Sequence, residues 1–327
     1  MLVQQKIRIG ITGYGNLGKG AEIAVNQNPD MELVAVFSRR KLSGTKSGVP
    51  VILLDEAEKY RDQIDVMLLC GGSATDLVEQ GPRLSRVFNT VDSFDTHAKI
   101  PDYFTAMDAA AKSAGKVATI SIGWDPGLFS LNRLLGGAVL PQGKDYTFWG
   151  KGVSQGHSDA IRRVPGVKDA KQYTVPKQDM LEAVRAGQDA PGAANETHSR
   201  ECYVVAEQGA DLALIESAIK TMPHYFAGYE TTVTFVSEAE FQARHTGIPH
   251  GGVVFRTGQT SPGVGHVVEF SLALDSNPEF TASVLTAYAR ATYRLSRQGA
   301  TGAHTIFDIP PGYLLPQTPE ELRKLLL

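Results

Sequence analysis

The chain has 327 residues, of which 42% are hydrophobic and 20% charged, values close to the average of globular proteins. Its formal net charge of -3 excludes the general basic field that favours nucleic acid or an anionic membrane surface. The sequence shows no apolar run of about 18 residues and no signal-peptide pattern, and Cys70 and Cys202 lack the spacing of a disulfide framework or zinc site. We therefore expect a cytoplasmic protein that binds neither nucleic acid nor membranes.

The first 122 residues alternate apolar runs with helical segments. Strands are predicted at residues 7–11, 31–37, 64–70, 88–92 and 116–122, and helices at 19–25 and 102–114. This alternation is typical of an α/β fold with a Rossmann-type doubly wound sheet.

The pattern changes after Gly127. Antiparallel strands are predicted at residues 200–206, 230–236, 252–257 and 266–273, with a helix at 211–221. Residues 123–276 are therefore predicted to form a second, mixed α+β domain for substrate binding and dimerisation. A long helix at 280–298 and a short strand at 306–308 are predicted to return to the first domain. The dinucleotide-binding domain is then 1–122, completed by about 277–327.

A glycine motif, Gly13-Tyr14-Gly15-Asn16-Leu17-Gly18, follows the first predicted strand and opens a predicted helix. A GxGxxG pattern between a strand and a helix is typical of a dinucleotide-binding turn, and a tight turn without a ligand is the alternative. The glycines allow a sharp turn and a close approach to a pyrophosphate at the positive end of the helix. We predict that Gly13, Tyr14, Gly15, Asn16 and Leu17 bind a dinucleotide.

The end of the second predicted strand indicates which dinucleotide is bound. An NAD enzyme has a carboxylate there for the ribose 2′-hydroxyl, whereas this chain has Ser38-Arg39-Arg40. A hydroxyl and two guanidiniums suit a 2′-phosphate, so NADP is predicted. A solvated basic turn is the alternative.

Two later strands are predicted to end at the same edge of the sheet. Small residues at the first of these ends, Cys70, Gly71, Gly72 and Ser73, let a cofactor pass close to the backbone, with a plain strand-to-helix turn as the alternative. We assign these four residues to the cofactor, and also Asp92, Ser93 and Phe94 at the second end.

Asp95 and Asp125 follow the carboxyl ends of the last two predicted strands of the first domain. Ligands of open α/β sheets bind at those ends, so both carboxylates are candidates for the reacting centre. Helix capping or an Asx turn is an equally good interpretation of either residue alone.

Histidines and arginines of the second half suit carboxylate recognition. His245 and His250 are five residues apart with a carboxylate nearby, but Pro249 rules out a regular helix that presents them together. We therefore predict no metal site and expect histidine and arginine to bind carboxylates.

Several sequence blocks resemble the meso-diaminopimelate D-dehydrogenase family, from about Lys6 to the C-terminal segment. They are Gly13–Gly18, Phe37–Arg40, Gly123–Gly127, Trp149 with Gln155–Asp159, Thr221–Pro223, His245–Gly252 and Asn277–Ser283. The resemblance implies NADP-dependent, reversible oxidative deamination of the D-centre of meso-2,6-diaminopimelate. The products are ammonia, NADPH and L-2-amino-6-oxopimelate, which cyclises to tetrahydrodipicolinate. The reaction belongs to lysine and diaminopimelate biosynthesis. The resemblance also implies a homodimer formed through the second domain.

The resemblance also implies residue roles. Asp95 and Asp125 would be catalytic, near the reacting D-amino group. The substrate would be bound by Trp124, Trp149, Gln155, Gly156, Asp159, Thr174, Arg200, His250 and Asn277. Such a substrate is a zwitterion at both ends, so carboxylates suit its ammonium groups, and Arg200 with His250 suits its distal carboxylate.

Two other functions remain open from the residues alone. Another NADP oxidoreductase of the same architecture, such as a dihydrodipicolinate reductase or a semialdehyde dehydrogenase, is the nearest. The latter needs an activated cysteine, and neither Cys70 nor Cys202 has an evident activating setting. A non-catalytic NADPH sensor would need the glycine motif but no pocket with opposite charges at its two ends.

Overall fold

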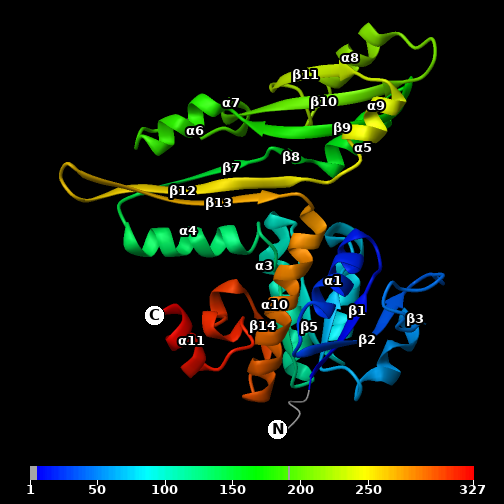
Figure 1. The fold of residues 1–327 in the computed structure, drawn as a ribbon, viewed down its shortest axis with the longest axis vertical. Helices are drawn as coiled ribbons and strands as arrows, with labels where there is room; N and C mark the ends of the chain where they lie inside the picture. Colours follow the sequence, from blue (N-terminus) through cyan, green and yellow to red (C-terminus); the bar gives the residue numbers. More distant parts are fainter. Residues whose placement is uncertain (1–5, 191) are drawn as a thin grey trace. The chain divides into compact units, whose positions relative to one another are not determined.

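The computed structural model describes residues 6–190 and 192–327, so the first five residues of the predicted first domain lie outside it. The chain divides into two compact units (Figure 1). Unit 1 comprises Met1–Leu131 and Pro278–Leu327, and unit 2 comprises Asn132–Asn277. No helix among the described residues is both long and apolar enough to cross a membrane.

Unit 1 contains a parallel sheet of seven described strands in the order β14-β6-β5-β4-β1-β2-β3. The strands are β1 (Ile7–Thr12), β2 (Met31–Ser38), β3 (Val51–Leu53), β4 (Val66–Leu69), β5 (Asn89–Asp92), β6 (Val117–Thr119) and β14 (Gly302–His304). This order confirms the predicted doubly wound fold. From β1 the chain first adds strands on one side and then, with β4, on the other side, and such sheets bind ligands at the point between these two strands.

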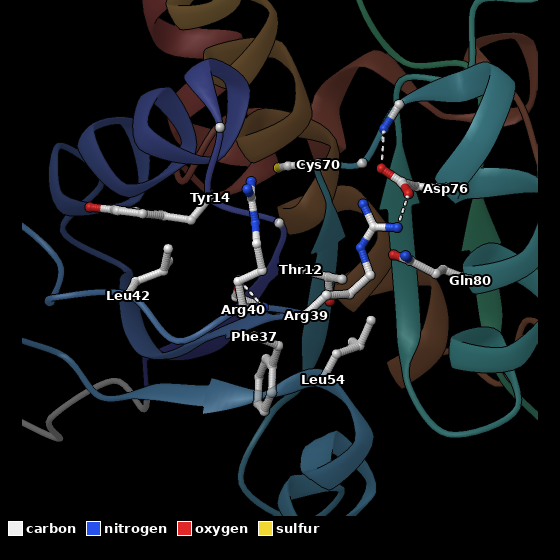
Figure 2. A pocket seen from close by; sticks show the side chains of 15 residues that line it. Thr12, Tyr14, Phe37, Arg39, Arg40, Leu42, Leu54, Cys70, Asp76 and Gln80 are labelled. Atoms are coloured by element: carbon white, nitrogen blue, oxygen red, sulfur yellow. Dashed lines mark hydrogen bonds and ion pairs between the residues drawn. The ribbon is translucent and has the colours of Figure 1, made fainter.

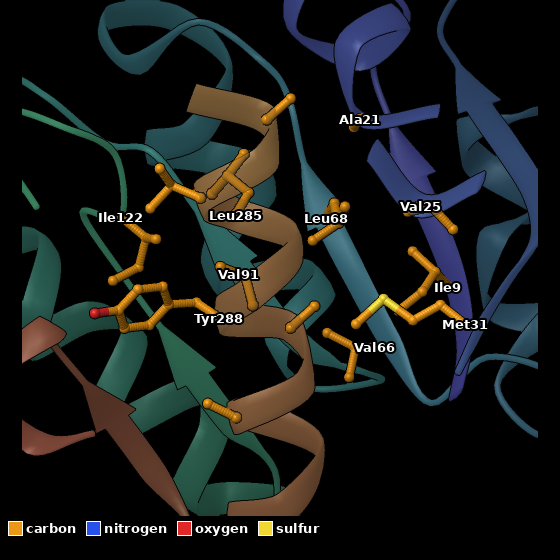
Figure 3. Packing of buried hydrophobic residues seen from close by; sticks show 14 of the residues in the cluster. Ile9, Ala21, Val25, Met31, Val66, Leu68, Val91, Ile122, Leu285 and Tyr288 are labelled. Carbon is orange, nitrogen blue, oxygen red and sulfur yellow. The ribbon is translucent and has the colours of Figure 1, made fainter. Parts of the chain in front are cut away.

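Helices cover both faces of this sheet, which explains why β4 is an uninterrupted apolar run. Val66 and Leu68 pack into one core cluster, and Met67 and Leu69 into the other. The first cluster is completed by α1 (Asn16–Asn26) and α10 (Asn277–Arg297), as Figure 3 shows. The second is completed by α2 (Val78–Ser85) and α3 (Ile100–Ser113).

Arg290 fixes α10 within unit 1 although its side chain is only 2% exposed. Its guanidinium donates two hydrogen bonds to Asp30, at 2.6 and 2.7 Å, and others to Asn28 and to the carbonyl of Leu314. Burial alone would raise the pKa of Asp30, but the hydrogen bonds and charge of Arg290 outweigh burial and lower it.

The C-terminal segment differs from the prediction at residues 306–308. The strand lies earlier, at Gly302–His304, and Ile306–Asp308 forms a short 3-10 helix. Thr305 and Asp308 cap each other reciprocally, which closes the chain into a turn before any strand can continue. A further 3-10 turn, Pro311–Tyr313, and α11 (Pro319–Leu326) follow.

Unit 2 contains two described sheets, ordered β11-β10-β9-β8 and β13-β12-β7. The strands are β7 (Lys144–Trp149), β8 (Gly152–Val153), β9 (Val167–Pro176), β10 (His198–Ala206), β11 (Glu230–Phe235), β12 (His250–Ser261) and β13 (Val264–Leu274). Its helices are α5 (Gln155–Arg162), α6 (Gln178–Arg185), α7 (Ala194–Thr197), α8 (Leu212–Lys220) and α9 (Glu238–Arg244). The boundary between the units falls within α4 (Leu128–Val139).

The prediction that β10 and β11 are antiparallel is wrong. They pair in parallel because α8 carries the chain back across the sheet before β11 begins. β10 is antiparallel to β9, and β12 is antiparallel to both β7 and β13. The second unit is therefore a mixed α+β arrangement, as predicted.

The Asp30–Arg290 pair gives a testable prediction for stability. Asp30→Asn should lower the free energy of unfolding by about 3 kcal/mol near neutral pH, because a buried guanidinium loses its counter-charge. The folded-state pKa of Asp30 is lowered, so this contribution is complete above the ordinary carboxyl pKa and is lost as pH falls through the lowered value.

Urea unfolding of both proteins at several pH values from neutral to acid measures this difference. Asp55→Asn is the matched control, because its carboxylate is 94% exposed, and should change stability by under about 0.5 kcal/mol. A wild-type advantage of the same size at every pH would contradict the assigned interaction.

Candidate active site

Unit 1 has a cavity of about 230 Å³ at the carboxyl ends of β1, β2 and β4 (Figure 2). It is lined by Thr12, Gly13, Tyr14, Gly15, Phe37, Ser38, Arg39, Arg40, Leu42, Leu54, Cys70, Gly71, Gly72, Asp76 and Gln80. The structure thus brings together the glycine motif, the basic turn and the end of β4, three segments far apart in sequence. The cavity lies at the switch point of the sheet.

The three glycines of the motif have different reasons to be glycine. Gly13 has a φ of +88°, and a Cβ on Gly18 would lie 2.1 Å from the carbonyl oxygen of Gly13. A Cβ on Gly15 would meet no atom within 4 Å. The first and third glycines therefore shape the turn into α1, while the second keeps space open at the helix N-terminus, as a pyrophosphate requires.

The basic turn after β2 presents two guanidiniums to the cavity. Arg39 pairs with Asp76 at 2.9 Å. Arg40 has no ion-pair partner within residues 6–190 or 192–327, and its side chain points into the cavity near Tyr14 (Figure 2). The Ser38 hydroxyl accepts a hydrogen bond from the Arg40 main chain at 3.2 Å. This hydroxyl and these guanidiniums fit a phosphate at the cavity mouth.

A buried carboxylate holds the loop that follows the basic turn. Glu22 of α1 is 1% exposed and accepts hydrogen bonds from the Tyr14 hydroxyl and the Ser47 main chain. The Tyr14 hydroxyl also accepts one from the main chain of Lys46 at 3.2 Å. The loop carrying Leu42 is thereby tied to the glycine motif as one wall of the cavity.

The side chains of Asp92 and Phe94 are not among those that line this cavity, so their assignment to the cofactor stays a prediction. Asp92 is fully buried and accepts hydrogen bonds from the main chain of Phe94 and Ser121 and from the Tyr103 hydroxyl. Burial raises its pKa to about 6. Phe94 stacks on Tyr103 at 4.1 Å. These side chains build the corner after β5, and Ser93, between them, is half-buried.

Asp95 and Asp125 follow strands that end at the same, carboxyl edge of the sheet. β5 and β6 are neighbours, and the main chain of Ile122 donates to the carbonyl of Asp92 at 2.8 Å. Asp95 is exposed, and its main chain donates to Ser73 at the end of β4. Asp125 is half-buried in a turn that Gly127 closes, where a Cβ would lie 1.8 Å from a carbonyl oxygen.

Neither cysteine is suited to nucleophilic chemistry. Cys70 lines the cavity and Cys202 lies in β10, and both are buried. Burial raises the pKa of each thiol to about 12, so neither forms a thiolate near neutral pH. A semialdehyde dehydrogenase mechanism through a cysteine is therefore not supported.

In unit 2, Arg200 lies at the centre of a second cluster. It is 9% exposed, donates to the Thr174 hydroxyl and lies 4.2 Å from the ring centre of Tyr229. Its Nε has no hydrogen-bond partner, and no carboxylate among the described residues pairs with it. Burial lowers its pKa. A buried guanidinium that lacks a counter-charge is costly, and an anion bound beside it would offset that cost.

His250 is brought to the same strands. Thr174 pairs with Gly152 on one side and with Arg200 on the other. A Cβ on Gly152 would lie 2.4 Å from the imidazole of His250, so only glycine leaves room for that ring. Burial lowers the pKa of His250, which keeps the imidazole neutral at physiological pH.

Two further histidines flank Arg200, although sequence reasoning assigned them no role. Burial, reinforced for both by the charge of Arg200, lowers the pKa of His157 and of His198 to about 4. His157 Nδ1 lies 2.7 Å from the hydroxyl of Ser154, and His198 accepts a hydrogen bond from the main chain of Trp149 at 2.9 Å. Both imidazole rings are therefore neutral neighbours of Arg200.

The remaining predicted substrate residues are distributed around unit 2 and the end of unit 1. Gln155, Gly156 and Asp159 belong to α5, whose N-terminus is capped by the Ser154 side chain. Asp159 pairs with Arg162. Trp149 is 38% exposed at the end of β7, Trp124 is buried at the turn of Asp125, and Asn277 begins α10 with its main chain bound to Ile248.

The central part of the sequence matches a family model. Residues 123–276 match the diaminopimelic acid dehydrogenase C-terminal domain. The meso-diaminopimelate D-dehydrogenase of Ureibacillus thermosphaericus is 63% identical over 324 residues, covering 98% of this chain and 99% of the relative. That of Corynebacterium glutamicum is 48% identical over 316 residues, covering 97% and 98%. The chain belongs to the meso-diaminopimelate D-dehydrogenase family.

Solved structures agree with this membership. The Corynebacterium glutamicum enzyme in complex with diaminopimelate has a TM-score of 0.90 and 47% identity, covering 99% of this chain and all of that one. An engineered D-amino acid dehydrogenase bound to NADP+ has a TM-score of 0.85 and 46% identity, with the same coverage. The family comprises amino-acid dehydrogenases, so membership decides against the sensor and the other oxidoreductases considered above.

Proposed function

We propose that this protein is an NADP-dependent meso-diaminopimelate D-dehydrogenase. It catalyses the reversible oxidative deamination of the D-centre to L-2-amino-6-oxopimelate, with release of ammonia and formation of NADPH, in lysine and diaminopimelate biosynthesis. The observation that carries the proposal is Arg200, buried in unit 2 with no carboxylate partner among the described residues, in a chain with full-length relatives of that activity. A cytoplasmic location is part of the proposal.

The cavity of unit 1 fits NADP. Gly15 leaves open space at the N-terminus of α1 for the pyrophosphate, and Arg40 is a guanidinium with no ion-pair partner among the described residues, which suits a 2′-phosphate. NADP held by these residues would supply the acceptor for the hydride that leaves the D-carbon of the substrate. We assign the other lining residues of the glycine motif, the basic turn and the end of β4 to holding it in place.

Asp95 and Asp125 are the residues proposed to act on the reacting amino group. A hydride leaves carbon only when the nitrogen lone pair is available, so the ammonium must first lose a proton. A carboxylate beside it accepts that proton or orients the neutral amine, and later activates the water that attacks the iminium. Trp124, next to Asp125 in sequence, and Trp149 are proposed to line the reacting end.

The far end of the substrate is assigned to unit 2. Arg200, Thr174 and His250 bind the distal carboxylate, and Asn277 binds the distal amine. Charge-assisted hydrogen bonds from a planar guanidinium match the two oxygens of a carboxylate. Gln155, Gly156 and Asp159 are proposed to line the same pocket from the first turns of α5.

The distal assignment is tested with Arg200→Met. Formation of NADPH, followed at its reduced-nicotinamide absorbance, is compared for separated diaminopimelate stereoisomers and simple D-amino acids. The wild-type enzyme should prefer the meso isomer. The variant should lose about 2–5 kcal/mol in kcat/KM for that isomer, because the distal carboxylate is left unpaired, and less for simple D-amino acids.

Arg185→Met is the matched control, because that arginine pairs with Glu269 on the surface of the same unit. Equal losses with both classes of substrate would make Arg200 a structural residue. No NADPH from any amino acid with the wild-type enzyme would overturn the proposed function.

The reacting end is tested with Asp95→Asn and Asp125→Asn. Turnover should fall about 10²-fold or more, because the amide cannot accept the proton, while the dissociation constant for NADP stays unchanged. Steady-state kinetics and equilibrium binding measure the two quantities separately. Asp102→Asn, an exposed carboxylate of α3, should match the wild type. Near-normal turnover in both site variants would exclude these carboxylates from the mechanism.

We infer that the enzyme is a homodimer assembled through unit 2. β13 is an edge strand of eleven residues, and Val264, Val267 and Val268 along it are 39–47% exposed. On α4, Leu134, Leu135 and Val139 are 45–65% exposed. A long apolar edge left open invites pairing, and a second copy of the chain covers the same surface on both partners.

The dimer is tested with Leu135→Glu and Val267→Lys. Light scattering after size exclusion should give twice the chain mass for the wild type and the mass of one 35.2 kDa chain for a double variant. Leu214→Glu is the control, because Leu214 is 68% exposed on α8, away from β13 and α4 in sequence. A double variant that stays dimeric would place the interface elsewhere.

A further inference from the structure

Asp76 is an acidic side chain in the cavity assigned above to a phosphate. Among the residues lining that cavity it is the one carboxylate, and it lies 2.9 Å from a guanidinium nitrogen of Arg39 (Figure 2). Asp76 has no role in the proposed reaction. Negative charge at a site for a dianion opposes binding, so its presence requires an explanation.

The two members of this ion pair differ in freedom. The Asp76 carboxylate also accepts the main-chain N–H of Gly72 at 3.1 Å and is 16% exposed. A Cβ on Gly71 would lie 2.7 Å from the Asp76 Cβ, so the turn after β4 packs directly on this side chain. Arg39 is 67% exposed and has a long side chain. The carboxylate is therefore fixed, and the guanidinium is the partner that can move.

The ion pair also stands where two cavities meet. Arg39, Leu54, Asp76 and Gln80 line the cavity of about 230 Å³ and also a neighbouring one of about 340 Å³. Arg39 follows β2 and Asp76 follows β4, so their contact spans the space between the ends of these strands. The ion pair therefore lies at the boundary between the two cavities.

We propose that Asp76 competes with the 2′-phosphate of the cofactor for Arg39, and thereby sets the affinity for NADP and the discrimination against NAD. The inference rests on the proposed function, because it takes NADP as the ligand of this cavity. A phosphate has more charge and more acceptor oxygens than a carboxylate, so it displaces Asp76 from the guanidinium of Arg39. Breaking the Arg39–Asp76 ion pair costs free energy, which lowers the affinity for the phosphate. NAD has no 2′-phosphate and leaves the pair closed.

The test uses Asp76→Asn in the full-length protein, with 2′,5′-ADP, 5′-AMP, NADP and NAD as probes in calorimetric titrations. Asparagine keeps an oxygen for the Gly72 N–H but removes the charge. The dissociation constants of 2′,5′-ADP and NADP should fall about two- to fivefold, the range that an exposed ion pair is worth. Those of 5′-AMP and NAD should not change.

Two comparisons isolate the pair from general electrostatics. Glu79→Gln makes the same change of net charge on α2, next to the second cavity, and should leave all four dissociation constants at wild-type values. In an Arg39→Met background, which binds 2′,5′-ADP more weakly, adding Asp76→Asn should have no further effect. The cycle attributes the gain to release of Arg39.

Each outcome bears on a different claim. Weaker or unchanged binding of 2′,5′-ADP by Asp76→Asn overturns the competition, weaker binding showing that Asp76 positions Arg39 for the phosphate. An equal gain with Glu79→Gln, or a gain that persists without Arg39, overturns it as well. A wild-type protein that binds 2′,5′-ADP no better than 5′-AMP refutes the assignment of NADP itself.

Discussion

A guanidinium that is buried with no carboxylate partner among the described residues is the constraint on which the proposed substrate chemistry depends. Arg200 is removed from water yet stays charged, because the pKa of a guanidinium is too high for burial to neutralise it. The neighbours that the structure gives it, a tyrosine ring, a threonine hydroxyl and nearby neutral imidazoles, supply no negative charge. The folded chain therefore has an uncompensated cost that a bound carboxylate removes.

The cofactor cavity of unit 1 solves a different problem with the same side chain. Its arginines are exposed, so water solvates them in the empty enzyme and a missing anion costs little. Arg39 has an internal partner that a phosphate can replace, whereas Arg40 has none among the described residues. The two sites therefore differ in the solvation of their arginines. The exposed arginines of unit 1 can exchange one anion for another at little cost, whereas the buried Arg200 is stabilised only when an anion lies beside it.

Much of unit 1 could be predicted from sequence because its signals are local. The glycine motif, the basic turn and the all-apolar β4 each require a backbone conformation or burial that a few adjacent residues encode. Properties that depend on tertiary packing could not be predicted. Asp92 and Asp95 are three residues apart, and nothing in the sequence distinguishes the buried carboxylate from the exposed one. The direction of β11 depended on the crossover through α8. The ring of Tyr229 reaches Arg200 from a segment that no motif connects with it.

The neutral histidines determine how selective the distal site can be. If His157 or His198 were protonated, two or more cations would stand around the substrate and any polyanion would suit them. Burial and the charge of Arg200 keep both neutral, so the cluster has one positive charge and matches one carboxylate. An amino acid without that carboxylate leaves Arg200 as it was in the free enzyme: it forgoes the gain but adds no new penalty. Under the proposed function, selectivity for a dicarboxylic substrate is limited to the worth of one buried charge-assisted pair, and we expect simple D-amino acids to be poor substrates that the site does not exclude.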